Sequence, residues 1–167
     1  MTKRDNHYEA AFEEYLRARQ QPYVAVDESR RSLVAESSLK SVDFIVSSAS
    51  GDSWLVDVKG RRFPSGEQKQ YWRNWSTRDD LDSLASWEQL FGERFGGLFV
   101  FAYDVVGDRA PLPAERLFEF RGSLYAFLGI RRRDYAQHAR PISPAWDTVA
   151  MPAETFRRLA APFDSFL

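Results

Sequence analysis

The sequence predicts an α/β fold in which helices pack against a mixed central sheet, and three observations lead to this prediction. Apolar residues recur at helical spacing in residues 5 to 20 and again in residues 78 to 93. Between and after these stretches lie short runs rich in Val, Ile, Phe and Tyr, which are typical of strands. The chain is 44% hydrophobic, which is ample for a real core and argues against wholesale disorder.

The first half of the chain predicts the order helix, three strands, helix, strand. Asp5 or Asn6 caps a helix that runs to about Gln20, and Pro22 stops it. Thr77 caps the second helix, which ends near Gly92. The predicted strands are "YVAV", "SVDFIVS", "SWLVDVKG" and "GGLFVFAY" at residues 23–26, 41–47, 53–60 and 96–103. Residues 27–40 read as a polar connector, and residues 60–77 as a long functional loop.

The second half continues the same α/β pattern beyond Pro111 and Pro113. A hairpin through Gly122, a short helix in "RDYAQHAR", a strand in "WDTVAM" and a final helix with Pro152 at its first position are predicted. We therefore expect a single domain over residues 1–167. Residues 5–104 would form its core, and residues 105–167 an α+β extension packed on that core.

Composition excludes several classes of function. The chain has no cysteine, so disulfide frameworks and thiol nucleophiles are excluded, and a cytoplasmic location is expected. The charged N-terminus has no apolar signal region, and no apolar run is long enough to cross a membrane. Its two isolated histidines lack the spacing of a zinc site. No Gly-rich phosphate loop is present, so no nucleotide cofactor is expected. No G-x-S-x-G elbow accompanies the serines, which argues against a hydrolase triad.

Asp57 and Lys59 lie two positions apart in the strand-like stretch "WLVDVKGRRF". Residues two apart in a strand project to the same face, so these side chains should lie together. If the preceding hairpin folds about Ser50, Asp43 lies across from Asp57, and two facing carboxylates repel each other. A bound cation would relieve this conflict, which is typical of functional sites. The simpler interpretation is an ordinary ion pair on a strand edge.

Carboxylate and carbonyl oxygens are the ligands that Mg²⁺ prefers. Asp43, Asp57 and the backbone carbonyl of Val58 would supply such oxygens, with Mn²⁺ as a substitute ion. Lys59 would orient or deprotonate the attacking water, or neutralise charge in the transition state. A carboxylate on the first helix, Glu9 or Glu13, would complete the cluster.

This pattern resembles the PD-(D/E)XK nuclease superfamily, over roughly residues 5–104. The resemblance implies a three-layer, restriction-endonuclease-like core and a Mg²⁺-dependent endonuclease activity. Asp43 stands at the aspartate position of the motif, Asp57 and Lys59 at the D-x-K positions, and Glu9 at that of the helix acid, with Glu13 as the alternative. The sequence departs from the motif in having Val42 rather than proline before the aspartate. The stretch "HYEAAFE" also resembles the signature of the HYExAFE family of bacterial proteins.

Basic and aromatic residues alternate after the D-x-K stretch, a composition that suits contacts with nucleic acid. Trp72 and Trp75 would either stack on bases or pack the loop onto the core. On the second helix, Glu88 and Gln89 are further polar candidates, with Gln89 in a second tier with Glu13. The predicted nucleic-acid-binding residues are Arg61, Arg62, Lys69 and Arg73.

Two functions follow from these observations. The leading hypothesis is a metal-dependent nuclease acting on phosphodiester bonds, with DNA favoured over RNA as its partner. The alternative is a non-catalytic module that binds nucleic acid or protein and keeps the nuclease-like core. No membrane partner is expected, and a homodimer is left open.

Overall fold

The structure is a computed structural model, and it describes residues 6–27, 32–34, 37–143, 145 and 147–167 of the chain. Within these residues no helix is both long and apolar enough to span a bilayer. The α-helices are α1 (His7–Ala18), α2 (Arg78–Phe91), α3 (Arg132–His138) and α4 (Ala153–Leu159). The strands are β1 (Tyr23–Ala25), β2 (Ser32–Val34), β3 (Ser37–Leu39), β4 (Phe44–Ser47), β5 (Ser53–Phe63), β6 (Ser76–Thr77), β7 (Phe95–Val105), β8 (Phe118–Phe120), β9 (Ser123–Arg131), β10 (Arg140–Ser143), β11 (Thr148–Ala150) and β12 (Ala161–Pro162).

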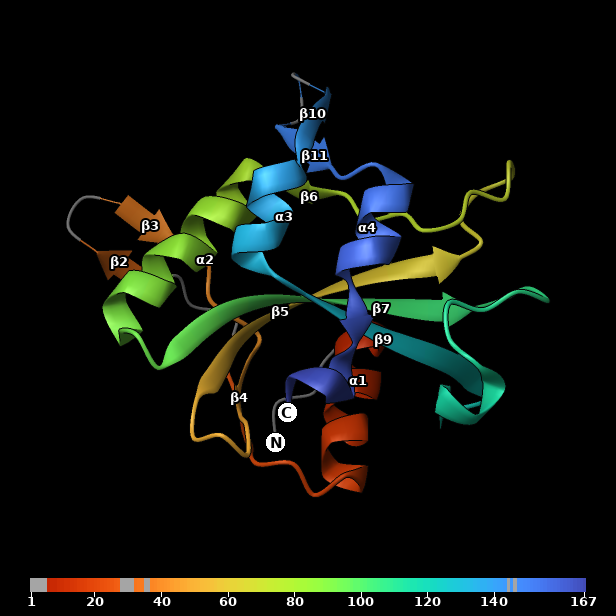
Figure 1. The fold of residues 1–167 in the computed structure, drawn as a ribbon, viewed down its shortest axis with the longest axis horizontal. Coiled ribbons are helices and arrows are strands. Elements are labelled where there is room, and N and C mark those ends of the chain that lie inside the picture. Colours follow the sequence, from red (N-terminus) through yellow and green to blue (C-terminus); the bar gives the residue numbers. More distant parts are fainter. Residues whose placement is uncertain (1–5, 28–31, 35–36, 144, 146) are drawn as a thin grey trace.

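A twisted mixed sheet forms the centre of the molecule (Figure 1). Its strand order is β1-β4-β5-β7-β9-β12, and β8 pairs with the edge of β9. The long strands β5 and β7 run parallel, while the other pairs of this sheet are antiparallel. Two smaller sheets, β10-β11-β6 and β2-β3, lie beside it. The prediction of an α/β fold with a mixed central sheet is therefore confirmed.

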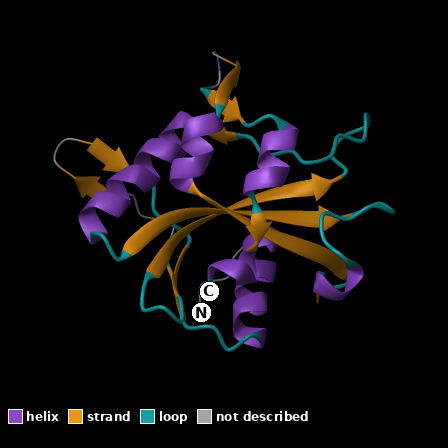
Figure 2. Cartoon of the chain, in the orientation of Figure 1, coloured by secondary structure: helices purple, strands orange, loops and turns teal. Residues whose placement is uncertain are grey.

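Helices cover both faces of this sheet, which gives three layers (Figures 1 and 2). On one face, the apolar side of α1 packs through Phe12 against Phe44 and Val56. On the other face, α2, α3 and α4 enclose a second core that includes Leu55 and Phe101. Adjacent residues of β5 thus enter different cores, because side chains alternate along a strand.

The predicted caps and hairpins are confirmed where the structure describes them. Asn6 caps α1 by accepting a hydrogen bond from the Tyr8 amide, and Thr77 caps α2. The hairpin of β4 and β5 pairs Phe44 with Val56, the register expected for a turn centred on Ser50.

Other boundaries differ from the prediction. The predicted connector 27–40 contains the β2-β3 hairpin, although residues 28–31 and 35–36 lie outside the described residues. This Ser-rich stretch has no clear alternation, so sequence patterns alone do not reveal its pairing. β5 runs on to Phe63, three residues beyond its predicted end, because its pairing with β7 continues to Val105. Pro152 precedes α4 as its cap rather than opening it. The division into core and extension stays a prediction, although β9 belongs to the central sheet.

Candidate active site

Asp57 and Lys59 lie between apolar residues on the β5 face that α2 covers. Leu55 and Phe63, which share their side of the strand, are fully buried in the second core. The side chains of Asp57 and Lys59 keep only 21% and 14% of their surface exposed. Burial of charged groups costs free energy unless they are paired, so these two side chains need charged partners from other parts of the chain.

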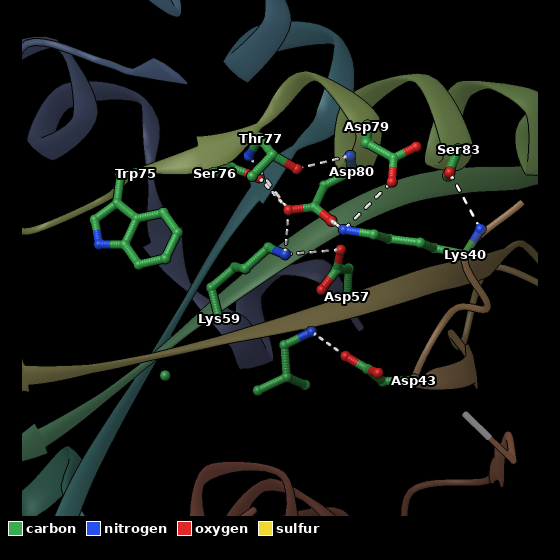
Figure 3. A network of polar contacts seen from close by, with 12 residues as sticks. Lys40, Asp43, Asp57, Lys59, Trp75, Ser76, Thr77, Asp79, Asp80 and Ser83 are labelled. Carbon is green, nitrogen blue, oxygen red and sulfur yellow. Dashed lines mark hydrogen bonds and ion pairs between the residues drawn. The ribbon is translucent and has the colours of Figure 1, made fainter. Parts of the chain in front are cut away.

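Two lysines and two aspartates compensate one another at this point (Figure 3). The Lys59 ammonium lies 3.2 Å from the Asp57 carboxylate and 2.8 Å from that of Asp80. The other oxygen of Asp80 lies 2.8 Å from the Lys40 ammonium. We call these four residues the charge network. The Lys59 ammonium bridges the two carboxylates, and the exposed Asp79 also pairs with Lys40, at 3.5 Å.

Asp80 is positioned by the beginning of α2. It is the third residue of that helix and forms a capping box with Thr77, in which its amide donates to the Thr77 hydroxyl and its carboxylate accepts from the Thr77 amide. Ser76 also donates to the same carboxylate, at 3.1 Å. The helix cap that ends the loop therefore fixes the acid that holds Lys59.

The charge network shifts the pKa of its members in different directions. Burial raises the pKa of Asp57, and the neighbouring Lys59 ammonium opposes that rise. Burial would lower the pKa of Lys59, but the carboxylates of Asp57 and Asp80 outweigh it and the pKa is raised. For Asp80, burial opposes ionisation, yet Lys59 and Lys40 hold its pKa well below the ordinary range. Lys59 is therefore an ammonium at neutral pH, which suits it to stabilise negative charge.

Acid should destabilise the fold through Asp80. Because its folded pKa lies below its unfolded value, its contribution is complete above about pH 4 and is lost as pH falls through the folded pKa. Asp57, with its pKa raised, acts in the opposite sense at higher pH. We expect the free energy of unfolding of Asp80→Asn to fall less steeply below about pH 4 than that of the parent, as measured by denaturant unfolding across pH. Asp82→Asn, an exposed change on α2, should keep the parent's slope; parallel curves for Asp80→Asn and the parent would contradict this assignment.

Asp43 lies beside the same strand, just before β4 begins. Its amide donates to the Val56 carbonyl at 2.8 Å, and its buried carboxylate accepts a hydrogen bond from the Val58 amide at 2.6 Å. Alternate residues of a strand direct their backbone groups to the same edge, so the Val58 carbonyl also lies along the edge that Asp43 borders. The Asp43 carboxylate and the Val58 carbonyl thus lie at the same edge of β5, and Asp57 precedes Val58 in the chain.

These donors suit a hard divalent cation in their chemistry. Carboxylate and carbonyl oxygens match the preference of Mg²⁺ and Mn²⁺. Burial also raises the pKa of Asp57, so a bound cation would favour the ionised form of its carboxylate. Among the residues that the structure describes, no group of three or more His, Asp or Glu side chains is gathered in a position to hold a metal ion. The roles of Asp43, Asp57, Val58 and Glu9 as ligands stay predictions.

The two candidate helix acids lie on α1, which packs on the opposite face of the sheet. Glu9 is buried in the first turn and accepts a hydrogen bond from Asn6 at 3.2 Å. Glu13 lies one turn further, about 6 Å along the axis, and contacts Arg17 and Tyr23. The choice between them stays open.

A cleft of about 510 Å³ opens beside Lys59. Its walls come from the start of α1, from β5 at residues 58–61 and from the segment that leads into α2. The α1 wall lies close to β5, because the Tyr8 ring fills the space where a Cβ of residue 60 would stand. Glycine at this position therefore lets the helix end approach the strand. The lysine of the D-x-K stretch thus borders a space open to a large ligand.

The predicted nucleic-acid contacts differ in their placement. Arg61 lines the cleft, whereas Arg62, Lys69 and Arg73 are exposed on β5 and the following loop. Of the two tryptophans, Trp72 packs against Phe63 and other residues of the second core, and Trp75 borders the cleft. Trp72 thus packs the loop onto the core, the second of its two predicted roles.

Gln89 lies at the other end of the sheet. It lines a separate cavity of about 900 Å³ near Ser53 and Arg94, and Ser53 is about 20 Å along β5 from Lys59. Glu88 accepts from the Gly97 amide and pairs with Arg132. The helix residue beside the D-x-K stretch is Asp80, which sequence reasoning missed. Thr77 and Asp80 have the spacing of a helix cap, and that spacing gives no sign of a contact with Lys59.

The comparisons with known proteins agree with this architecture. No family model and no curated protein matches the sequence. Among solved structures, the chain is similar to Hjc from Archaeoglobus fulgidus, a Holliday junction resolvase of an archaeal hyperthermophile. The TM-score is 0.55, with 11% identity over 96% of this chain and 97% of the other. The chain has the restriction-endonuclease-like fold. The resemblance to the HYExAFE family stays a prediction.

Proposed function

We propose that the protein is a nuclease that hydrolyses phosphodiester bonds of nucleic acid with the help of a divalent cation. The observation that carries this proposal is the charge network, which holds the Lys59 ammonium beside Asp57 at the edge of an open cleft. The full-length likeness of fold to a Holliday junction resolvase supports it. At 11% identity the likeness shows the fold alone, so the proposed activity depends on these residues.

Each of these residues would have a separate role in hydrolysis. Asp43, Asp57 and the Val58 carbonyl, with Glu9 or else Glu13 as the helix acid, would hold Mg²⁺, which would lower the pKa of a bound water and polarise the phosphate. Lys59 would place its ammonium against charge that develops on the phosphate oxygens. Asp80 would keep that ammonium in position through its contact at 2.8 Å. The cleft would admit the nucleic-acid backbone.

A second function, binding without cleavage, is favoured by one feature of the same network. The Lys59 ammonium already contacts two carboxylates, so its charge is balanced within the protein. In a non-catalytic module this arrangement would serve stability alone.

Cleavage of a mixed panel of nucleic acids tests the proposal. We expect the purified protein to cut at least one of single-stranded DNA, duplex DNA, a four-way DNA junction and single-stranded RNA when Mg²⁺ or Mn²⁺ is present. A chelator should stop the reaction. Asp57→Asn, prepared in parallel, controls for contaminating nucleases. Binding to the panel without divalent-dependent cleavage would support the second function, and a rate shared by parent and variant would identify a contaminant.

A further inference from the structure

Trp75 is placed on the rim of the cleft with its ring partly open to solvent. It keeps 37% of its surface exposed. The Arg61 guanidinium carbon lies 3.8 Å from the ring centroid and covers one face of the indole. A flat aromatic surface beside a cleft is the kind of platform on which bases stack.

The backbone that carries Trp75 is anchored firmly. Its neighbours Asn74 and Ser76 are both buried. Asn74 exchanges two hydrogen bonds with the backbone of Met151, at 3.1 and 2.8 Å, and its own carbonyl accepts from the Tyr135 hydroxyl at 2.7 Å. Arg61 donates to the Trp75 carbonyl. The ring is thus held in advance, so a ligand would pay little conformational entropy to use it.

Arg61 supplies positive charge that the charge network does not cancel. Its described hydrogen bonds go to the carbonyls of Gly60 and Trp75, and none of the described carboxylates forms an ion pair with it. Burial lowers the pKa of Arg61 to about 10, which still leaves it charged at neutral pH. A cation with uncharged partners beside a cleft attracts a polyanion.

Two further rings line the same cleft. His7 and Tyr8 line it from the start of α1, with ring centroids 3.9 Å apart. A cleft lined by aromatic rings and an arginine suits the chemistry of strands whose bases are unpaired. Bases inside a duplex already stack on each other and do not present their faces to protein.

We propose that this cleft binds an unpaired stretch of nucleic acid by stacking a base on Trp75. Such a stretch would be the form of substrate that the proposed nuclease takes, so the inference rests on the same site. Binding is measured without divalent ions, which separates it from cleavage. DNA and RNA single strands share this stacking chemistry, and both enter the test.

The test measures affinity in chelator for labelled single strands of about twelve nucleotides, as DNA and as RNA, and for the duplex of the same sequence. Trp75→Ala should weaken single-strand binding about tenfold or more and leave duplex binding within about twofold. Trp75→Phe, which keeps a flat ring, should recover most of the affinity. The single strand whose affinity falls more in Trp75→Ala, DNA or RNA, is the nucleic acid that the cleft prefers.

Trp72→Phe is the matched control, since it changes a tryptophan of the same loop that packs in the core. It should bind every strand as the parent does, and thermal unfolding should show that all variants are folded. Unchanged single-strand affinity in Trp75→Ala, an equal loss for strand and duplex, or no binding by the parent would overturn the proposal. Binding that depends on Trp75 without any divalent-dependent cleavage would instead refute the proposed nuclease and leave this inference standing.

Discussion

Replacing Asp57 by asparagine should abolish divalent-dependent cleavage while leaving the protein folded. Asparagine keeps the shape of the side chain but removes a negative charge from the proposed ligand set. Loss of a residue that only hydrogen-bonds a metal ligand already lowers metal affinity or activity about 10- to 100-fold. For loss of a ligand itself, we expect the cleavage rate to fall at least about a hundredfold. Initial rates with saturating Mg²⁺ on the best substrate of the panel would measure this loss.

Stability and metal affinity would show whether the activity is lost through a missing metal ligand or through a damaged fold. Lys59 retains its partner Asp80 at 2.8 Å in the variant, so the free energy of unfolding should change little. Mn²⁺ affinity should fall, and nucleic-acid affinity in chelator should not. Asp82→Asn removes an exposed carboxylate from α2 and should match the parent in all three measurements. Full activity in Asp57→Asn would place the reaction elsewhere in the molecule.

Replacing Lys59 by methionine should destabilise the fold strongly as well as slow cleavage. Methionine keeps the apolar stem that lies beneath α2, so the change mainly removes the ammonium. Asp57 and the nearly buried Asp80 then face each other without the cation that bridges them. Breaking a buried ion pair from one side costs roughly 3–5 kcal/mol, and we expect a loss of this size in the free energy of unfolding.

A double variant separates the stability of the network from its chemistry. Adding Asp80→Asn to Lys59→Met removes one of the two carboxylates that then repel each other and should restore part of the lost stability, because neighbouring substitutions do not add. Cleavage should stay slow, since the ammonium that stabilises charge on the phosphate is still missing. Denaturant unfolding and initial rates on the same preparations would measure both. If the single variant were as stable as the parent, the charge network would not hold this part of the fold.

The main elements of the fold follow from local patterns in the sequence. Apolar residues at helical spacing and the caps at Asn6 and Thr77 are local signals, and both helices begin where those caps predict. The register of Phe44 with Val56 also follows from a short turn with turn-forming residues. The β2-β3 hairpin and the continuation of β5 to Phe63 depend on pairing with other strands, so local patterns do not reveal them.

For the candidate site, local sequence is enough to predict that Asp57 and Lys59 share one face of a strand, because alternation is a property of any strand. Only the folded chain brings Asp80 to both Lys59 and Lys40, since α2, β5 and the residue after β3 are distant in sequence. The same holds for the tryptophans. Trp72 and Trp75 lie in the same loop, and nothing in the local sequence distinguishes them. Trp72 packs against Phe63 in the core, whereas Trp75 borders the cleft. Three-dimensional packing decides which tryptophan borders the cleft, and no local sequence pattern encodes it.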